Sequence, residues 1–200
     1  GIYALGPNEV WLYSDHHFQK KNYPIARSIQ HAISDGDGGL WIATKIGLYH
    51  CAENNTTLYQ DTTQLVSAYV EDVALKNHEQ LWAVGLGGIS IREGNKMIKS
   101  LTTKDGLPTI DATCIDKAPD GTMWVGTRQG VVRYREDGSY SFRFSHRWLM
   151  NDDVRDINFD AEGNAWIATA GGVSVIKKRK MTLSEKEDFF CDVLMRRHIR

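Results

Sequence analysis

Short alternations of apolar and polar residues recur along the chain and end at polar turns. Residues 112–117 (ATCIDK) lead into the turn 119–121 (PDG), and residues 154–159 (VRDINF) lead into the turn 161–163 (AEG). Apolar residues at a period near two, bounded by such turns, are typical of a β-strand that ends in a hairpin. The pattern therefore predicts short antiparallel strands.

One strand of each unit carries a tryptophan that recurs every 41 or 42 residues. The four tryptophans, and the glycine that follows each of them six residues later, are Trp41, Trp82, Trp124 and Trp166 with Gly47, Gly88, Gly130 and Gly172. Such a period indicates one supersecondary unit that is copied along the chain and cannot bury its apolar surface alone. The recurring glycine predicts a tight turn with a positive φ.

A third and a fourth strand complete each unit, for example residues 131–135 and 140–144. Four short strands and one tryptophan in ~42 residues match the blade of a β-propeller, which is a four-stranded antiparallel sheet. We therefore predict an all-β fold made of propeller blades. The tryptophan and the small residue two positions later (Ala43, Gly126 and Ala168) are expected to face neighbouring blades, and Val84 is the one exception to the small size.

The two ends of the repeat are incomplete. Only 18 residues separate Trp11 from Ile29, and the last unit stops after its third strand. Three complete blades do not close a ring, because propellers carry about four to eight, so we predict a segment of a larger propeller or an open arc. The predicted blades of the propeller segment, residues 1–180, lie near 1–28 (partial), 29–66, 70–108, 112–149 and 154–178 (partial).

Residues 181–200 change to a helical period. Residues 182–185 and 184–187 both have the capping-box pattern, and one helical face would carry Leu183, Phe190, Val193 and Leu194. We predict a C-terminal amphipathic helix, which either docks on the propeller or links it to a further domain.

The composition, with 42% hydrophobic and 24% charged residues, is typical of a soluble ordered domain. No apolar run approaches the ~20 residues that span a bilayer, so no membrane contact is expected. The net charge of −1 offers no electrostatic basis for binding nucleic acid. The basic residues 177–180 are interpreted as a solvated strand end, with a polyanion-binding patch as the alternative. Three cysteines without a CxxC pair argue against disulfides and zinc.

Neither a metal nor a cofactor is predicted. Residues 35–39 (DGDGG) resemble the start of a calcium loop, but Ile46 stands where that loop needs a glutamate, and no helices flank it. A hairpin turn is therefore the preferred interpretation of these residues. The glycines within residues 85–88 and 170–172 precede strands, whereas a phosphate-binding loop precedes a helix.

The phrase D-G-x-[LM]-W-[IV]-[AG]-T is carried by residues 37–44 and 120–127, and D-G-L-P by residues 105–108. This pattern resembles the regulator-propeller repeat found in periplasmic sensor regions of hybrid two-component systems, mostly from Bacteroidetes-type bacteria. The resemblance covers roughly residues 29–176, and it implies a periplasmic or extracellular sensor domain that binds a ligand in signal transduction. The chain departs from the pattern at residues 148–153, where Gly-Leu-Pro should recur.

Inter-blade loops and the loops after the tryptophan strands share one face of a propeller, and loops on a rigid scaffold often carry function. Trp can stack on a sugar ring, while Arg and Asp can hydrogen-bond hydroxyls or carboxylates. The candidate ligand-binding residues on this face are His146, Arg147, Trp148, Asp152, Asp153, Lys45, Arg128 and Gln129. The alternative is that Trp148 only fills a gap between blades.

No coherent acid–base constellation accompanies the repeat. The leading hypothesis is therefore a non-enzymatic propeller module that binds an oligosaccharide or mediates domain contacts, including contacts to the remaining blades or a C-terminal domain of a longer parent chain. The rival is part of a secreted carbohydrate-active enzyme, a polysaccharide lyase or hydrolase, in which His146 and Arg147 serve as base and charge neutraliser. A structural spacer is the third hypothesis.

Overall fold

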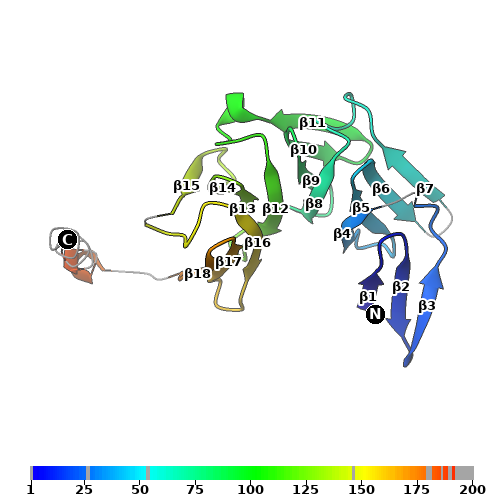
Figure 1. Cartoon of the computed structure of the whole chain (residues 1–200), viewed down its shortest axis with the longest axis horizontal. Helices are drawn as coiled ribbons and strands as arrows, with labels where there is room; N and C mark the ends of the chain where they lie inside the picture. The colour runs from blue at the N-terminus through cyan, green and yellow to red at the C-terminus, as the bar shows by residue number, and fades with distance from the viewer. Residues whose placement is uncertain are drawn as a thin grey trace.

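The computed structural model of the chain contains five antiparallel sheets arranged around an open arc (Figure 1). The structure describes residues 2–25, 28–52, 55–145, 147–178, 182–185, 187–188 and 191. Within these residues, three sheets have four strands each, and the first and the last have three. The prediction of an all-β fold made of propeller blades is therefore confirmed, and the described blades form an open arc.

Each sheet takes its strands in chain order. The first sheet contains β1 (Ile2–Leu5), β2 (Val10–Ser14) and β3 (His17–Lys21). The second contains β4 (Ile29–Ser34), β5 (Leu40–Thr44), β6 (Gly47–Ala52) and β7 (Asn55–Tyr59). The third contains β8 (Val70–Leu75), β9 (Gln80–Gly85), β10 (Gly88–Glu93) and β11 (Lys96–Leu101), followed by the 3₁₀ turn η1 (Thr103–Asp105). The last two contain β12 (Ala112–Lys117), β13 (Met123–Thr127), β14 (Gly130–Tyr134) and β15 (Tyr140–Arg143), then β16 (Val154–Phe159), β17 (Ala165–Thr169) and β18 (Gly172–Ile176).

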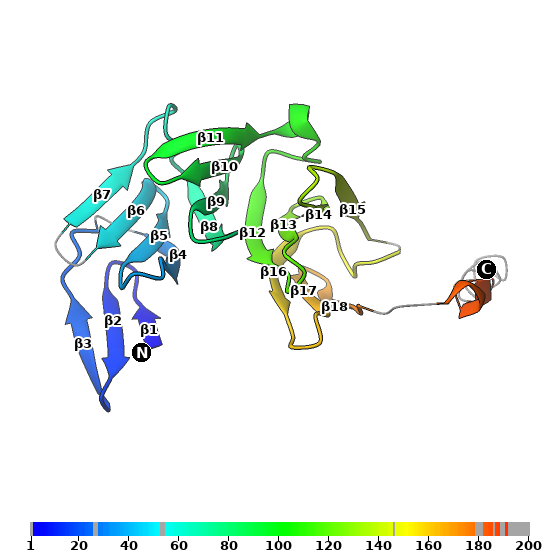
Figure 2. The same ribbon diagram turned by 180° about the vertical axis from the view of Figure 1, so that it is seen from behind.

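The inner strands β4, β8, β12 and β16 lie side by side through the centre of the arc, as the view from behind also shows (Figure 2). Each of them carries a β-bulge near its start. A bulge inserts one residue and increases the local twist of the strand. Successive sheets can therefore fan outward from their inner strands.

The tryptophan strand joins two sheet interfaces, because alternate side chains point to opposite faces of a strand. Trp82 packs with Ala112 and Ile115 of the following sheet. Its neighbours Leu81 and Ala83 instead pack into the apolar cluster shared with the preceding sheet. The hydrophobic core is thus divided into layers between sheets.

The last sheet has an exposed apolar face. Trp41, Trp82 and Trp124 are 8%, 5% and 6% exposed, whereas Trp166 is 48% exposed. Within the part of the chain that the structure describes, no further sheet follows β18 to cover Trp166 (Figure 1). The neighbouring Val173 and Val175 are exposed as well.

The turn after each tryptophan strand depends on a threonine and a glycine. The hydroxyls of Thr44, Thr127 and Thr169 donate to the carbonyl oxygen three residues later at 2.7, 2.8 and 2.7 Å. The predicted positive φ is confirmed at the four repeat glycines, with 150° at Gly47, 127° at Gly88, 97° at Gly130 and 129° at Gly172.

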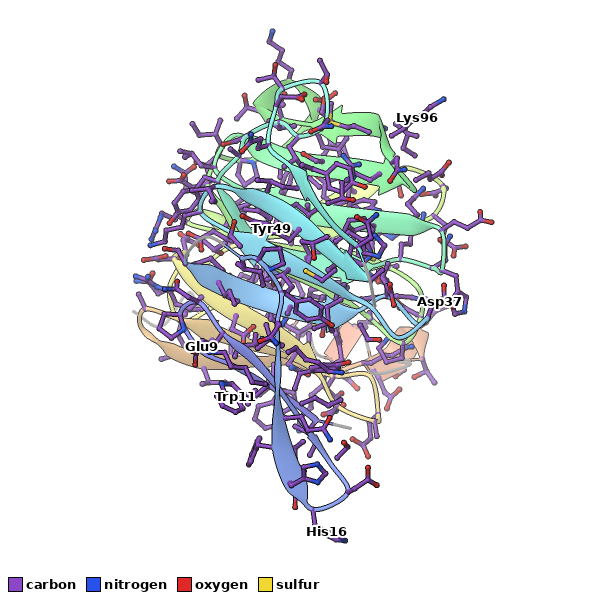
Figure 3. The ribbon with its side chains drawn as sticks, turned by 90° about the vertical axis from the view of Figure 1, so that its right-hand side faces the viewer. Glu9, Trp11, His16, Asp37, Tyr49 and Lys96 are labelled. Carbon is purple, nitrogen blue, oxygen red and sulfur yellow. The ribbon has the colours of Figure 1, made fainter. Side chains whose placement is uncertain are left out.

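The corresponding turn of the first sheet contains no glycine. Asp15 and His16 both have positive φ, 50° and 64°, between Ser14 and His17, which pair across the hairpin. Positive φ at both central residues is the geometry of a two-residue type I′ turn. Figure 3 shows His16 at the tip of this hairpin, away from Glu9 and Trp11.

Trp11 lies on the second strand of the first sheet, and its indole N–H donates to the Glu9 carboxylate at 3.3 Å.

The C-terminal residues begin with the predicted capping box. The backbone N–H of Thr182 donates to the Glu185 carboxylate at 2.8 Å, and the Glu185 N–H donates to the Thr182 hydroxyl at 3.2 Å. Residues 183–185, 187–188 and 191 have helical backbone, and Leu183 is 85% exposed. The other residues of the predicted apolar face, Phe190, Val193 and Leu194, lie outside the described residues.

Gly130 and Gly172 provide a matched test of the turn. A Cβ at Gly130 would lie 2.4 Å from the Arg143 carbonyl oxygen on the fourth strand, whereas a Cβ at Gly172 would meet no atom of the described residues within 4 Å, because its sheet has no fourth strand among them. We expect Gly172→Ala to lower the free energy of unfolding by about 1–3 kcal/mol through backbone strain alone. Gly130→Ala should cost about 1–3 kcal/mol more, through overpacking. Equal losses in urea titrations would contradict the role of the fourth strand.

Candidate ligand-binding site

The inter-blade loops and the turns after the tryptophan strands meet on one face of the structure. The N–H of Arg128 donates to the Asp111 carbonyl at 3.3 Å, and that of Gly130 donates to Asp152 at 2.7 Å. One sheet further, the N–H of Ala170 donates to the Asp153 carbonyl at 2.9 Å. The backbone therefore holds both kinds of loop in fixed positions relative to each other.

Arg128 and Asp153 form the centre of an ionic network on this face. The Arg128 guanidinium lies 3.6 Å from the Asp111 carboxylate and 3.3 Å from that of Asp153, which also accepts from Arg155 at 2.6 Å. About half of the Arg128 side chain is exposed, and exposed ion pairs contribute little stability. The network mainly connects the turn of the fourth sheet to the loops on either side of it.

Of the other predicted residues, Asp152 and Gln129 lie in the same region as Arg128, since the N–H of Gly130 donates to the Asp152 carbonyl at 2.7 Å, whereas Lys45 belongs to the turn of another sheet. Lys45 lies over the ring of Tyr69 at 5.8 Å, at the turn of the second sheet. The Asp152 carboxylate accepts hydrogen bonds from the N–H of Ser145 at 2.5 Å and from the Ser145 hydroxyl at 2.7 Å. These bonds hold the two ends of the inter-blade loop together. Gln129 is exposed beside Arg128. His146 lies outside the described residues.

Trp148 projects from the inter-blade loop between β15 and β16. Its N–H donates to the Phe144 carbonyl at 3.1 Å, and the guanidinium groups of Arg143 and Arg147 lie 5.0 and 4.9 Å from its ring centroid. Cation–π contacts of this kind hold an indole in position. Trp148 is 37% exposed, so it borders the gap between the last two sheets and still presents part of its surface to solvent.

Trp148 lines a cleft of 300 Å³ between the fourth and fifth sheets. Trp124 and Phe159 provide further aromatic surface, with ring centroids 5.6 Å apart. The charged groups of the lining are Arg133, Arg143, Lys177, Lys178 and Asp120. Positive charge therefore exceeds negative charge in the cleft.

Among the described residues, Asp120 provides the one carboxylate of this cleft, and it is already engaged. Arg133 donates to Asp120 at 2.9 Å, and Lys178 lies 3.9 Å away. Burial opposes ionisation of Asp120, but hydrogen bonds from Thr122 together with these two cations lower its pKa. For Arg143, burial and the neighbouring arginines lower the pKa, and its buried Nε has no hydrogen-bond partner among the described residues. The cleft therefore favours a ligand rich in acceptor oxygens.

The central channel holds titratable residues that the sequence analysis missed. This channel, of 650 Å³, is lined by the inner strands. His31 pairs with Asp72, whose second oxygen accepts the N–H of Ile115 at 2.8 Å and so joins two sheets. Burial, with the charges of Asp72 and Asp156, raises the pKa of Asp116. The sequence signal for the channel was a polar residue at the third position of β4, β8 and β16.

The acidic turn of the second sheet is a hairpin, as predicted. Asp35 accepts from the N–H groups of Asp37 and Gly39 at 2.9 and 2.8 Å, and from His50 at 2.9 Å. Among the described residues, no group of three or more His, Cys, Asp or Glu side chains is arranged to hold a metal ion. No helix in the same part of the chain is long and apolar enough to cross a membrane.

Solved structures with the same blade architecture come from several protein classes, although no protein-family model and no curated protein matches the chain. The extracellular domain of a putative hybrid two-component system from B. thetaiotaomicron matches with a TM-score of 0.73 and 20% identity, over 84% of this chain and 25% of that one. The resemblance to the regulator-propeller repeat is confirmed at the level of the fold. The chain thus spans about a quarter of the length of that sensor domain.

Two further structures show how widely this fold is used. PorZ, a surface component of the type-IX secretion system of Porphyromonas gingivalis, matches with a TM-score of 0.66 and 16% identity, over 88% of this chain and 31% of that one. Virginiamycin B lyase from Staphylococcus aureus matches with a TM-score of 0.64 and 12% identity, over 87% and 64%. Function must therefore be argued from the site and not from the fold.

His31 predicts a pH dependence of stability. The hydrogen bond to Asp72, opposed by burial and aided by the charges of Asp156 and Asp116, raises the pKa of His31 above 6.5. A raised histidine pKa adds stability below the unfolded-state pKa of about 6.5 and loses it as pH rises through the folded-state value. We expect the free energy of unfolding to fall more steeply as the pH rises above about 6 in the wild type than in His31→Gln.

Denaturant titrations across this pH range measure the effect, with His78→Gln, outside the channel, as the control. Curves for wild type and His31→Gln that run parallel would show that the pair with Asp72 does not titrate with folding.

Proposed function

We propose that this chain is a non-enzymatic, sensor-like segment of a periplasmic or extracellular β-propeller that binds an oligosaccharide at the Trp148 cleft. The similarity of the fold to the extracellular domain of a two-component system supports the setting and the sensor-like role. The regulator-propeller phrases at residues 37–44 and 120–127 support the same assignment.

The observation that carries the proposal is the combination of a partly exposed indole with a surplus of hydrogen-bond donors. Trp148 borders a cleft in which Arg133, Arg143 and two lysines are matched by the single carboxylate of Asp120. Saccharides present acceptor oxygens and apolar ring faces, which fit donors placed beside aromatic side chains. Because Arg143 and Arg147 fix the indole, little entropy is lost when a ligand binds.

Domain contacts are the second part of the proposal. The exposed side chains of Trp166, Val173 and Val175 form an apolar face on the last sheet. In the preceding sheets the equivalent tryptophan is buried by the next sheet. We propose that a further blade of a longer parent chain packs on this face in the same way.

A thermal-shift screen against neutral and acidic oligosaccharides tests ligand binding. A ligand at about 100 times its dissociation constant stabilises a fold by about 2.7 kcal/mol, which moves the melting temperature measurably. We expect a shift that Trp148→Ala abolishes. Trp166→Ala is the matched control, because Trp166 is also a partly exposed tryptophan, 48% against 37% for Trp148, but lies outside the cleft, and it should retain the shift.

The other hypotheses make different predictions in this experiment. A structural spacer predicts that no oligosaccharide moves the melting temperature. A polysaccharide lyase predicts a new unsaturated product that absorbs ultraviolet light when an acidic glycan is added. A shift that survives in Trp148→Ala would place the ligand elsewhere and contradict the site.

A further inference from the structure

A second cleft, of 460 Å³, lies between the third sheet and the fourth. Its aromatic lining consists of Trp82, Tyr134 and Tyr140, with ring centroids 5.6 Å apart for the first pair and 6.0 Å for the second. Trp82 and Tyr134 are 5% and 6% exposed, whereas Tyr140 is 44% exposed. The first two rings therefore form the bottom of the cleft, and Tyr140 stands at its mouth.

The Tyr134 hydroxyl is buried without a hydrogen-bond partner among the described residues. Native proteins rarely leave a buried polar group unpaired, because the lost hydration is not replaced. Burial, together with Tyr140 and Asp105, raises the pKa of Tyr134, so the phenol keeps its proton and remains a donor. A ligand oxygen at this position would receive the missing hydrogen bond.

Three lysines line the same cleft without an ion pair in the described part of the chain: Lys76, Lys99 and Lys104. Two carboxylates are also part of the lining, those of Asp105 and Glu136. Asp105 is occupied by the N–H and the hydroxyl of Thr102, at 3.0 and 3.1 Å. Arg135 is a fourth cation of the lining, so four cations face two carboxylates, and the cleft carries a net positive charge, which attracts anions.

We propose that this cleft is a binding site for an anionic saccharide, a sugar residue that carries a carboxylate or a sulfate. The acidic group is held by the lysines, the sugar ring packs against the aromatic lining, and Tyr134 donates to a ring substituent. The hydroxyl of Tyr134 is sealed from solvent in the free protein, so the proposal requires a lining side chain to move when the ligand enters. Tyr140, 44% exposed and 6.0 Å from Tyr134 between ring centroids, is the side chain placed to do so.

The site is separate from the Trp148 cleft. Arg133 and Tyr134 are adjacent in β14 and point to opposite faces of the fourth sheet, so that one residue lines each cleft. This second site therefore does not rest on the function proposed for Trp148.

Isothermal titration with a galacturonic acid trimer tests the proposal, with a neutral galactose trimer for comparison. The titrations use Trp148→Ala, which removes the first cleft from the measurement. We expect Lys99→Gln combined with Lys104→Gln to weaken binding of the acidic trimer about tenfold or more, since hydrogen bonds to charged groups are strong. Lys96→Gln, on the same strand as Lys99 but outside the cleft and exposed at the surface (Figure 3), should change it less than about twofold.

Three results of this titration would overturn the proposal. They are the absence of binding of the acidic trimer, equal affinity for the neutral trimer, and equal effects of the cleft variant and of Lys96→Gln.

Tyr134→Phe provides a second test, because it should change the melting temperature and the affinity for the acidic trimer in opposite directions. Removing an unpaired buried hydroxyl should raise the melting temperature of the free protein, whereas the missing donor should weaken binding of the acidic trimer about tenfold. A lower melting temperature with unchanged affinity would show that the hydroxyl has a structural partner and no role in binding.

Discussion

Burial of one tryptophan from each of the three four-stranded sheets against the next sheet is the interaction on which the rest of the structure depends. A single sheet of this size has two faces and no core of its own, so its apolar side chains are buried only between neighbours. Trp82 packs against the inner strand of the following sheet, and the residues on either side of it pack against the preceding sheet. One strand per sheet thus connects two layers of core.

This packing determines where chemistry can take place. The sheets fan outward from the bulged inner strands, so their side chains leave a central channel and clefts between neighbouring sheets. Both clefts proposed as binding sites lie beside a repeat tryptophan, Trp82 in one and Trp124 in the other. The tryptophans therefore serve as structural core and as the aromatic bottom of each cleft.

The fold was predictable because its determinants repeat in the sequence. A tryptophan every 41 or 42 residues and a glycine six residues later indicate the strand and the turn that follows it. The small residue two positions after the tryptophan is needed where Gly126 approaches Val154, since a Cβ there would lie 2.6 Å from the valine Cγ1. The type I′ turn at Asp15 and His16 escaped prediction, because it lacks the usual glycine.

The candidate sites were less predictable, because their residues occur once and depend on partners far away in the chain. The environment of Tyr134 is created by Trp82, 52 positions earlier. In the sequence Arg92 has the pattern of an exposed polar residue near the end of a strand, but it is fully buried. Its guanidinium lies 3.9 Å from the ring centroid of Tyr59 and donates to the Gln64 carbonyl at 2.6 Å. Single-sequence patterns report neither kind of contact.

Comparing Trp124→Ala with Trp166→Ala in equilibrium unfolding tests the central role of this packing most directly. The two residues occupy the same position in successive sheets, but Trp124 is 6% exposed and Trp166 is 48% exposed. We expect a loss of about 3–5 kcal/mol in the free energy of unfolding for Trp124→Ala, which empties a buried site, and less than half of that loss for Trp166→Ala. Equal losses would mean that burial against the following sheet is not what stabilises the structure.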